Sequence, residues 1–175
     1  VDELLGVPEI AGTQEIELGR IHAFPNHPFK VLDDERMDML VESIRENGIL
    51  NPVIVRPDKN GDYEMISGHR RLHAAGIVGL SKIPAIVKEM SDDEAIIKMV
   101  DANIQREEIM PSEKAFAYKM KLEAMKRTAG RPTKENACHN GTHLRSDQEL
   151  ALQVGDSARS IQRYIRLTEL IPELL

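Results

Sequence analysis

Residues 67–75 decide the fold of this chain and read Ser-Gly-His-Arg-Arg-Leu-His-Ala-Ala. The glycine lies where a strand-like run at 63–66 turns into a helical pattern over 69–78. A helix start with bare N–H groups binds anions through its backbone, and guanidinium groups bind phosphate or carboxylate in a bidentate way. With Arg70 and Arg71 directly behind Gly68, the segment predicts an anion site, and a nucleotide phosphate is the favoured ligand.

A second polar segment lies about thirty residues further on, at 101–108, and reads Asp-Ala-Asn-Ile-Gln-Arg-Glu-Glu. It ends another predicted helix and carries Asn103, Gln105 and Arg106. On its own the segment would be interpreted as a polar helix end. The two arginines of the first segment have an alternative interpretation too, because exposed arginines often form surface ion pairs.

The sequence around these segments predicts a small α+β domain. Apolar spacing predicts helices over 34–46, 69–78 and 92–105, and β-branched runs predict strands at 17–23, 53–56, 63–66 and 83–87. Asp33 or Asp34 can cap the first helix, and Ser91 with Glu94 forms a capping box before the third. We expect a flexible arm over 1–16 and this domain over 17–109.

Beyond Pro111 the pattern becomes helical only, which predicts an all-α domain over 110–175. A helix over 112–126 is followed by a flexible loop over 127–146, which is rich in Gly, Pro, Asn, Thr and Ser. Residues 147–167 then match a helix-turn-helix. Ala151 is small where the helices cross, and Gly155 lies where the turn needs a left-handed residue.

The second helix of this motif is basic. Ser157 can cap it, and its outer face carries residues that can bind DNA, namely Ser157, Arg159, Ser160, Gln162, Arg163 and Arg166. Arginine pairs with guanine edges and glutamine with adenine edges in the major groove, and arginine and serine also bind phosphates. The alternative is a plain helical hairpin with a solvated basic face.

Composition narrows the class of protein. The chain has 175 residues, of which 41% are hydrophobic and 3% aromatic, so the core is aliphatic. The single Cys138 excludes an internal disulfide, and no apolar run is long enough to span a bilayer, so we expect a cytoplasmic protein without membrane contact. The net charge is −6, but residues 111–175 hold 11 Lys and Arg against 8 Asp and Glu. That basic segment favours nucleic acid as a partner.

With both halves described, the order of motifs resembles the ParB-type chromosome and plasmid partition proteins, over roughly residues 16–175. The motifs are Gly-His-Arg-Arg, Ile-Pro-Ala-Ile-Val, Asn-Ile-Gln-Arg-Glu, Pro-Ser-Glu-Lys-Ala and the helix-turn-helix. The resemblance implies a ParB/sulfiredoxin-like N-terminal domain and a helical DNA-binding domain. It also implies a C-terminal dimerisation domain beyond residue 175.

The functional expectations follow from this resemblance. It implies a nucleoid-associated homodimer that binds a palindromic, centromere-like DNA site, works with a ParA-like ATPase and is switched to a sliding clamp by CTP with Mg²⁺. Matched motifs place the nucleotide at Gly68, His69, Arg70, Arg71, Asn103, Gln105 and Arg106. Asn103 would also hold the Mg²⁺–phosphate group.

The chain departs from the family pattern at positions that matter for hydrolysis. The family usually has glutamate where this chain has His69 and Ala102, and arginine where it has His73 and Phe29. CTP hydrolysis therefore stays open, and no catalytic residue is assigned. Two alternatives also stay open. One is a transcription regulator or nucleoid occlusion factor with a weakened switch, and the other is a small-molecule kinase or sulfiredoxin-like enzyme.

Overall fold

The computed structural model describes residues 12–104, 109–128 and 146–169. It divides into two compact units, which are described separately. The first unit contains residues 12–27 and 31–90, and the second contains residues 28–30 and the described residues from 91 onward. No helix in the described part of the chain is long and apolar enough to cross a membrane.

The first unit is built on a five-stranded mixed sheet with the strand order β1-β5-β3-β4-β2. The strands are β1 (Thr13–Glu17), β2 (Ile21–Ala23), β3 (Val53–Pro57), β4 (Tyr63–Ser67) and β5 (Lys82–Val87). β3 lies in the middle, parallel to β5 and antiparallel to β4. β1 is antiparallel to β5 at one edge, and β2 is parallel to β4 at the other. A short 3-10 turn, η1 (Leu18–Arg20), joins β1 to β2.

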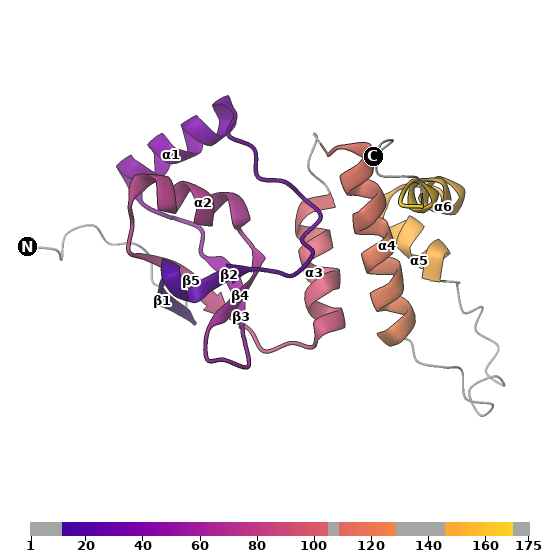
Figure 1. Cartoon of the computed structure of the whole chain (residues 1–175), viewed down its shortest axis with the longest axis horizontal. Coiled ribbons are helices and arrows are strands. Elements are labelled where there is room, and N and C mark those ends of the chain that lie inside the picture. Colours follow the sequence, from indigo (N-terminus) through magenta and orange to yellow (C-terminus); the bar gives the residue numbers. More distant parts are fainter. Residues whose placement is uncertain (1–11, 105–108, 129–145, 170–175) are drawn as a thin grey trace, which may run out of the picture. The chain divides into compact units, whose positions relative to one another are not determined.

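Two helices cover the same face of this sheet, as Figure 1 shows. They are α1 (Glu35–Asn47) and α2 (His69–Val78). Their inward side chains form one aliphatic core with alternate side chains of the strands. The buried members of this core are Ile16, Ile21, Met37, Val41, Ile44, Ile49, Val53, Val55, Met65, Ala74, Ala75, Ile83 and Ala85. Val53 and Val55 are buried in β3, because alternate side chains of a strand point to the same face. Gly68, at the start of α2, lies against Val53, in the middle strand of the sheet.

The second unit contains helices only: α3 (Asp92–Ile104), α4 (Pro111–Thr128), α5 (Ser146–Val154) and α6 (Ala158–Leu167). α4 packs against the other three, and α5 and α6 also pack on each other across a turn at 155–157 (Figure 1). Gly155 has a φ of 74° in this turn. One buried cluster consists of Tyr118, Leu122, Met125, Leu150, Ala151 and Ile161, and Met99 and Val100 of α3 are also fully buried.

Several local expectations are confirmed. Asp34 caps α1 by accepting from the backbone N–H of Met37 at 2.9 Å, and Ser157 caps α6 by accepting from that of Ser160 at 3.0 Å. The capping box forms, since the N–H of Ser91 donates to the Glu94 carboxylate at 2.9 Å. Leu150, Val154 and Ile161 pack the last two helices together, as their spacing predicts.

Three expectations differ from the structure. Residues 13–16, assigned to the flexible arm, form β1, because pairing with β5 gives their backbone partners that no local pattern signals. The single strand expected over 17–23 is interrupted by η1. The helix at 92–104, assigned with the sheet domain, belongs to the second unit, where it packs on α4. The expected loop over 127–146 lies mostly outside the described residues, between the end of α4 and the start of α5.

Candidate anion site and basic helix

The junction between β4 and α2 accepts only glycine. Gly68 follows the last residue of β4 with φ 114° and ψ 22° and serves as the N-cap of α2. A Cβ at this position would lie 2.6 Å from Cγ1 and 3.0 Å from Cβ of Val53, which is fully buried in β3. Both the positive φ and the missing side chain are therefore required, and they bring the start of α2 against the central strand.

The start of α2 has the features of an anion site. No side chain caps it, and its first turn contains no acidic residue. The first N–H groups of a helix lack intrahelical partners, and the helix dipole favours negative charge at this end. A phosphate group would supply that charge. This geometry supports the anion site that the Gly-His-Arg-Arg segment predicts.

Arg71 is held by the protein backbone. One guanidinium nitrogen donates to the carbonyl oxygens of Asn51 at 2.5 Å and Pro52 at 2.8 Å, just before β3 begins. Burial lowers the pKa of Arg71, but a guanidinium still stays protonated at neutral pH. Arg71 thus ties the first turn of α2 to the chain entering β3.

Arg70 instead pairs with the residues that start α1. Its guanidinium lies 3.3 Å from the same Asp34 oxygen that caps α1. One helical turn later, the imidazole of His73 lies 2.7 Å from Asp33. Two aspartates therefore face two basic side chains of α2, and an incoming anion would compete with Asp34 for Arg70. From the sequence alone, Asp33 and Asp34 are recognisable only as candidate caps, because no short-range signal pairs residues about forty positions apart.

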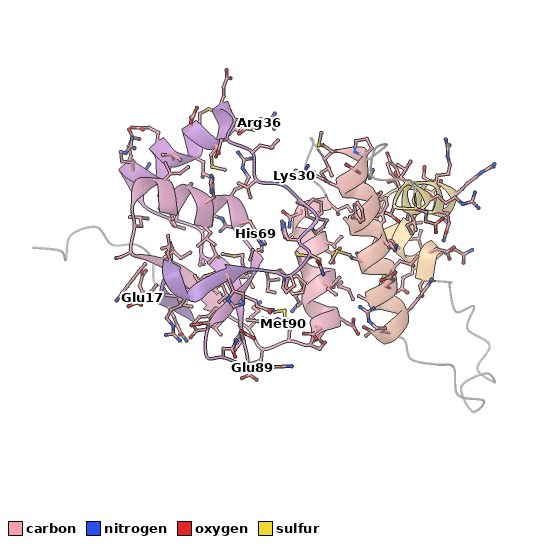
Figure 2. All side chains as sticks on the ribbon, in the orientation of Figure 1. Glu17, Lys30, Arg36, His69, Glu89 and Met90 are labelled. Carbon is pink, nitrogen blue, oxygen red and sulfur yellow. The ribbon has the colours of Figure 1, made fainter. Side chains whose placement is uncertain are left out.

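His69 is buried at the start of α2 (Figure 2), and its ring stacks on that of His27 with centroids 3.8 Å apart and a tilt of 34°. His69 and His73 thus have different surroundings. Among the described residues, no group of three or more His, Cys, Asp or Glu side chains lies close enough to hold a metal ion.

The second predicted segment is described only in part. Asn103 lies in α3, is 2% exposed and donates its amide to the carbonyl oxygen of Met99 at 2.7 Å. Asp101 pairs with the buried ammonium of Lys121 at 2.5 Å. Gln105 and Arg106 lie outside the described residues. The structure thus brings together the four site residues of the first segment, and Asn103 belongs to the other unit.

The basic face predicted for the last helix is present on α6. Arg159, Gln162, Arg163 and Arg166 are exposed, whereas Ser160 is half-buried and Ser157 is engaged as the cap. Ser160 and Arg163 also line an open hollow with Tyr164 and Leu167. Gln162 donates to Asp147 of α5 at 3.3 Å, a contact that DNA would have to replace. The helix contains no Asp or Glu, so its outer face attracts phosphate.

Comparisons with known proteins identify the family of this chain. The family described as "ParB N-terminal domain" matches residues 6–104. The chromosome-partitioning protein Spo0J of Thermus thermophilus is 35% identical over 165 residues, which cover 94% of this chain and 54% of that protein. A nucleoid occlusion protein of Bacillus cereus is 34% identical over 92% of this chain and 49% of its own length. This chain therefore spans about half the length of the curated relatives it matches.

Two solved structures of Caulobacter crescentus ParB, both C-terminally truncated, are also similar. The one complexed with CTP-gamma-S is 29% identical with a TM-score of 0.50, over 93% of this chain and 81% of that chain. The one complexed to the centromeric parS site is 24% identical with a TM-score of 0.57, over 92% and 74%, and shows the shared fold. From the family match over more than half of its residues, this chain belongs to the ParB N-terminal domain family.

Proposed function

We propose that this chain is the nucleotide- and DNA-binding part of a partition protein that acts on chromosomal or plasmid DNA. The observation that carries the proposal is the start of α2, where Gly68 leaves a bare helix N-terminus against β3 with Arg70 beside it. Proteins named for chromosome partitioning are among the relatives, and one similar structure is named as a complex with CTP-gamma-S.

The nucleotide is proposed to be CTP with Mg²⁺, with its phosphates at Gly68, His69, Arg70 and Arg71. The donor set fits a phosphate group, because it combines helix N–H groups with guanidinium groups. Asn103, Gln105 and Arg106 are proposed to complete the site, with Asn103 near Mg²⁺. Bound Mg²⁺ would neutralise phosphate charge. Asp101 is not proposed to replace the glutamate usual in the family, because its carboxylate pairs with Lys121.

DNA is proposed to bind at the helix-turn-helix formed by α5, the 155–157 turn and α6. Arg159, Gln162, Arg163 and Arg166 provide donors on one exposed face, and Ser160 lies at its edge. Ser157, the N-cap of α6, is proposed to contact a DNA phosphate. Three arginines without a carboxylate on the same helix support phosphate contact, and Gln162 supports reading of a base edge.

The further properties of the whole protein rest on the family alone. We propose a nucleoid-associated homodimer that binds a palindromic site and cooperates with a ParA-like ATPase. A two-fold dimer is the usual partner of a palindromic site, because each subunit reads one half-site.

Calorimetric titration with CTP, ATP, GTP and UTP in the presence of Mg²⁺ tests the nucleotide proposal, with and without duplex DNA. We expect CTP to bind, the other three to bind more weakly, and Arg70→Ala to weaken the interaction. If none of the four nucleotides gives a binding heat, with or without DNA, the nucleotide site is refuted. The DNA-binding part of the proposal would then be tested by itself.

A second candidate function is a nucleoid occlusion factor, which the Bacillus cereus relative favours because its identity to this chain is nearly the same. Selection of bound sites from fragmented genomic DNA separates the two. Sites clustered near a replication origin support partition, and sites dispersed over the chromosome support nucleoid occlusion.

A further inference from the structure

The turn between α5 and α6 is tied to α4 by a cluster of polar and aromatic side chains that the nucleotide and DNA contacts do not include. Asp156 occupies the middle of this turn, between Gly155 and the cap Ser157. One of its carboxylate oxygens accepts from the ammonium of Lys114 at 2.9 Å and from the hydroxyl of Tyr118. Both partners belong to α4, so the cluster joins the turn to the helix beneath it.

Aromatic rings complete the cluster. The Lys114 ammonium lies 5.5 Å from the ring centroid of Tyr118 and 5.0 Å from that of Tyr164 on α6, within cation–π range. The two rings meet edge to face with centroids 5.7 Å apart. Tyr164 belongs to the hollow that Arg163 also lines. The contacts therefore reach from α4 through the turn to the helix that carries the arginines.

The protonation states suit a stable contact. Burial raises the pKa of Tyr118, so its hydroxyl stays a donor. The hydrogen bonds from Tyr118 and Lys114 lower the pKa of Asp156, so its carboxylate stays ionised and accepts from both. A carboxylate near the start of α6 would otherwise repel DNA phosphates, and its pairing with Lys114 offsets that charge.

We propose that Tyr118 and Lys114 are positioning residues for DNA binding: by binding the carboxylate of Asp156, they hold the 155–157 turn on α4 and fix the direction of α6. The inference rests on the proposed DNA-binding function and adds residues that do not touch DNA. A helix that is free to tilt would present its arginines to the phosphates in only part of the population.

A double-mutant cycle with Tyr118→Phe and Arg163→Ala tests this role. The probe is a fluorescein-labelled DNA duplex of mixed sequence, titrated at low ionic strength and followed by anisotropy. Tyr118→Phe changes no formal charge, so it reports on positioning. We expect it to weaken binding about threefold to tenfold, as when the competent orientation falls to between a third and a tenth of the population. Tyr63→Phe on β4 is the matched control and leaves the affinity unchanged.

The coupling between the two substitutions separates positioning from a general structural effect. If Tyr118 aims Arg163, the double variant loses less affinity than the product of the single losses, because a misdirected arginine contributes less. Multiplicative losses, or no effect of Tyr118→Phe in a folded variant, would overturn the positioning role. No effect of Arg163→Ala would overturn the DNA assignment and this inference with it.

A second variant keeps the test decisive if Tyr118→Phe does not fold. Lys114→Met removes one of the two donors to the Asp156 carboxylate, whereas Lys126→Met removes the same charge from the exposed end of α4. Circular dichroism and thermal melting verify that each variant is folded. We expect Lys114→Met to lose more DNA affinity than Lys126→Met, and equal losses would contradict the inference.

Discussion

Replacing Gly68 with alanine tests how the start of α2 is built. The backbone φ of 114° disfavours any residue with a Cβ, and the left-handed region costs such a residue about 1–2 kcal/mol. The new methyl group would also lie 2.6 Å from Cγ1 of Val53, and overpacking a core typically costs about 1–3 kcal/mol. Together these give about 2–5 kcal/mol, a large share of a domain stability of about 5–15 kcal/mol.

Gly76→Ala in the same helix is a matched control with the opposite expected sign. Nothing lies within 4 Å of a Cβ at Gly76, and its φ lies outside the positive range. The added methyl group should stabilise the helix by about 0.5–1 kcal/mol, since glycine is unfavourable in helix interiors. The same chemical change should therefore destabilise the protein at the N-cap of α2 and stabilise it near the C-terminal end of that helix.

Amide hydrogen exchange of peptides covering β3, β4 and α2 measures the effect where it arises, since the two units need not unfold together. Urea unfolding followed by circular dichroism provides the free energy for the whole chain. If the clash with Val53 contributes, Val53→Ala combined with Gly68→Ala loses less stability than the sum of the single changes. A Gly68→Ala variant within about 0.5 kcal/mol of the parent protein would refute the reasoning, because surface substitutions typically have such small effects.

Four further expectations concern both units. Arg71→Ala should abolish nucleotide binding and leave specific DNA binding nearly intact, because the guanidinium ties the start of α2 to the carbonyls before β3. Calorimetry measures the nucleotide affinity and anisotropy the DNA affinity. Loss of DNA binding with nucleotide affinity unchanged would contradict this assignment. Asp34→Asn should raise nucleotide affinity about twofold to threefold by removing the carboxylate that competes for Arg70, a small effect because the pair is partly exposed; an unchanged affinity would argue against competition. Asp156→Asn should cost about 1 kcal/mol near neutral pH after allowance for exposure. Since the pKa of Asp156 is lowered in the folded protein, its contribution to the free energy of unfolding is complete above the unfolded pKa near 3.8. That contribution disappears as the pH falls through the folded pKa. The stabilities of the parent protein and of Asp156→Asn, measured as a function of pH, should therefore converge at low pH. Leu150→Ala should cost about 2–5 kcal/mol in thermal or urea unfolding, because this fully buried side chain joins α5 to α4 and α6.

The elements that sequence analysis located correctly depend on short-range information. The caps Asp34 and Ser157, the Ser91–Glu94 box and the turn at Gly155 each involve residues within about four positions of one another. Spacing of apolar residues likewise predicted the packing of Leu150 and Ile161. Such signals are present in any short window of the chain, so they can be identified before the fold is known.

The arrangement at the start of α2 shows where local information ends. Local patterns in the sequence predict that Gly68, Arg70 and Arg71 begin a helix after a strand, and that the last helix has a basic outer face. The contacts of Arg71 with the carbonyls before β3 and of Arg70 with Asp34 form only in the folded chain. The same holds for β1 on β5 and for Asp156 on α4. Partners this far apart in the sequence, at least 19 positions in these cases, meet only after the chain has folded. The sequence near a charged residue does not show which of the many oppositely charged or polar groups it will contact.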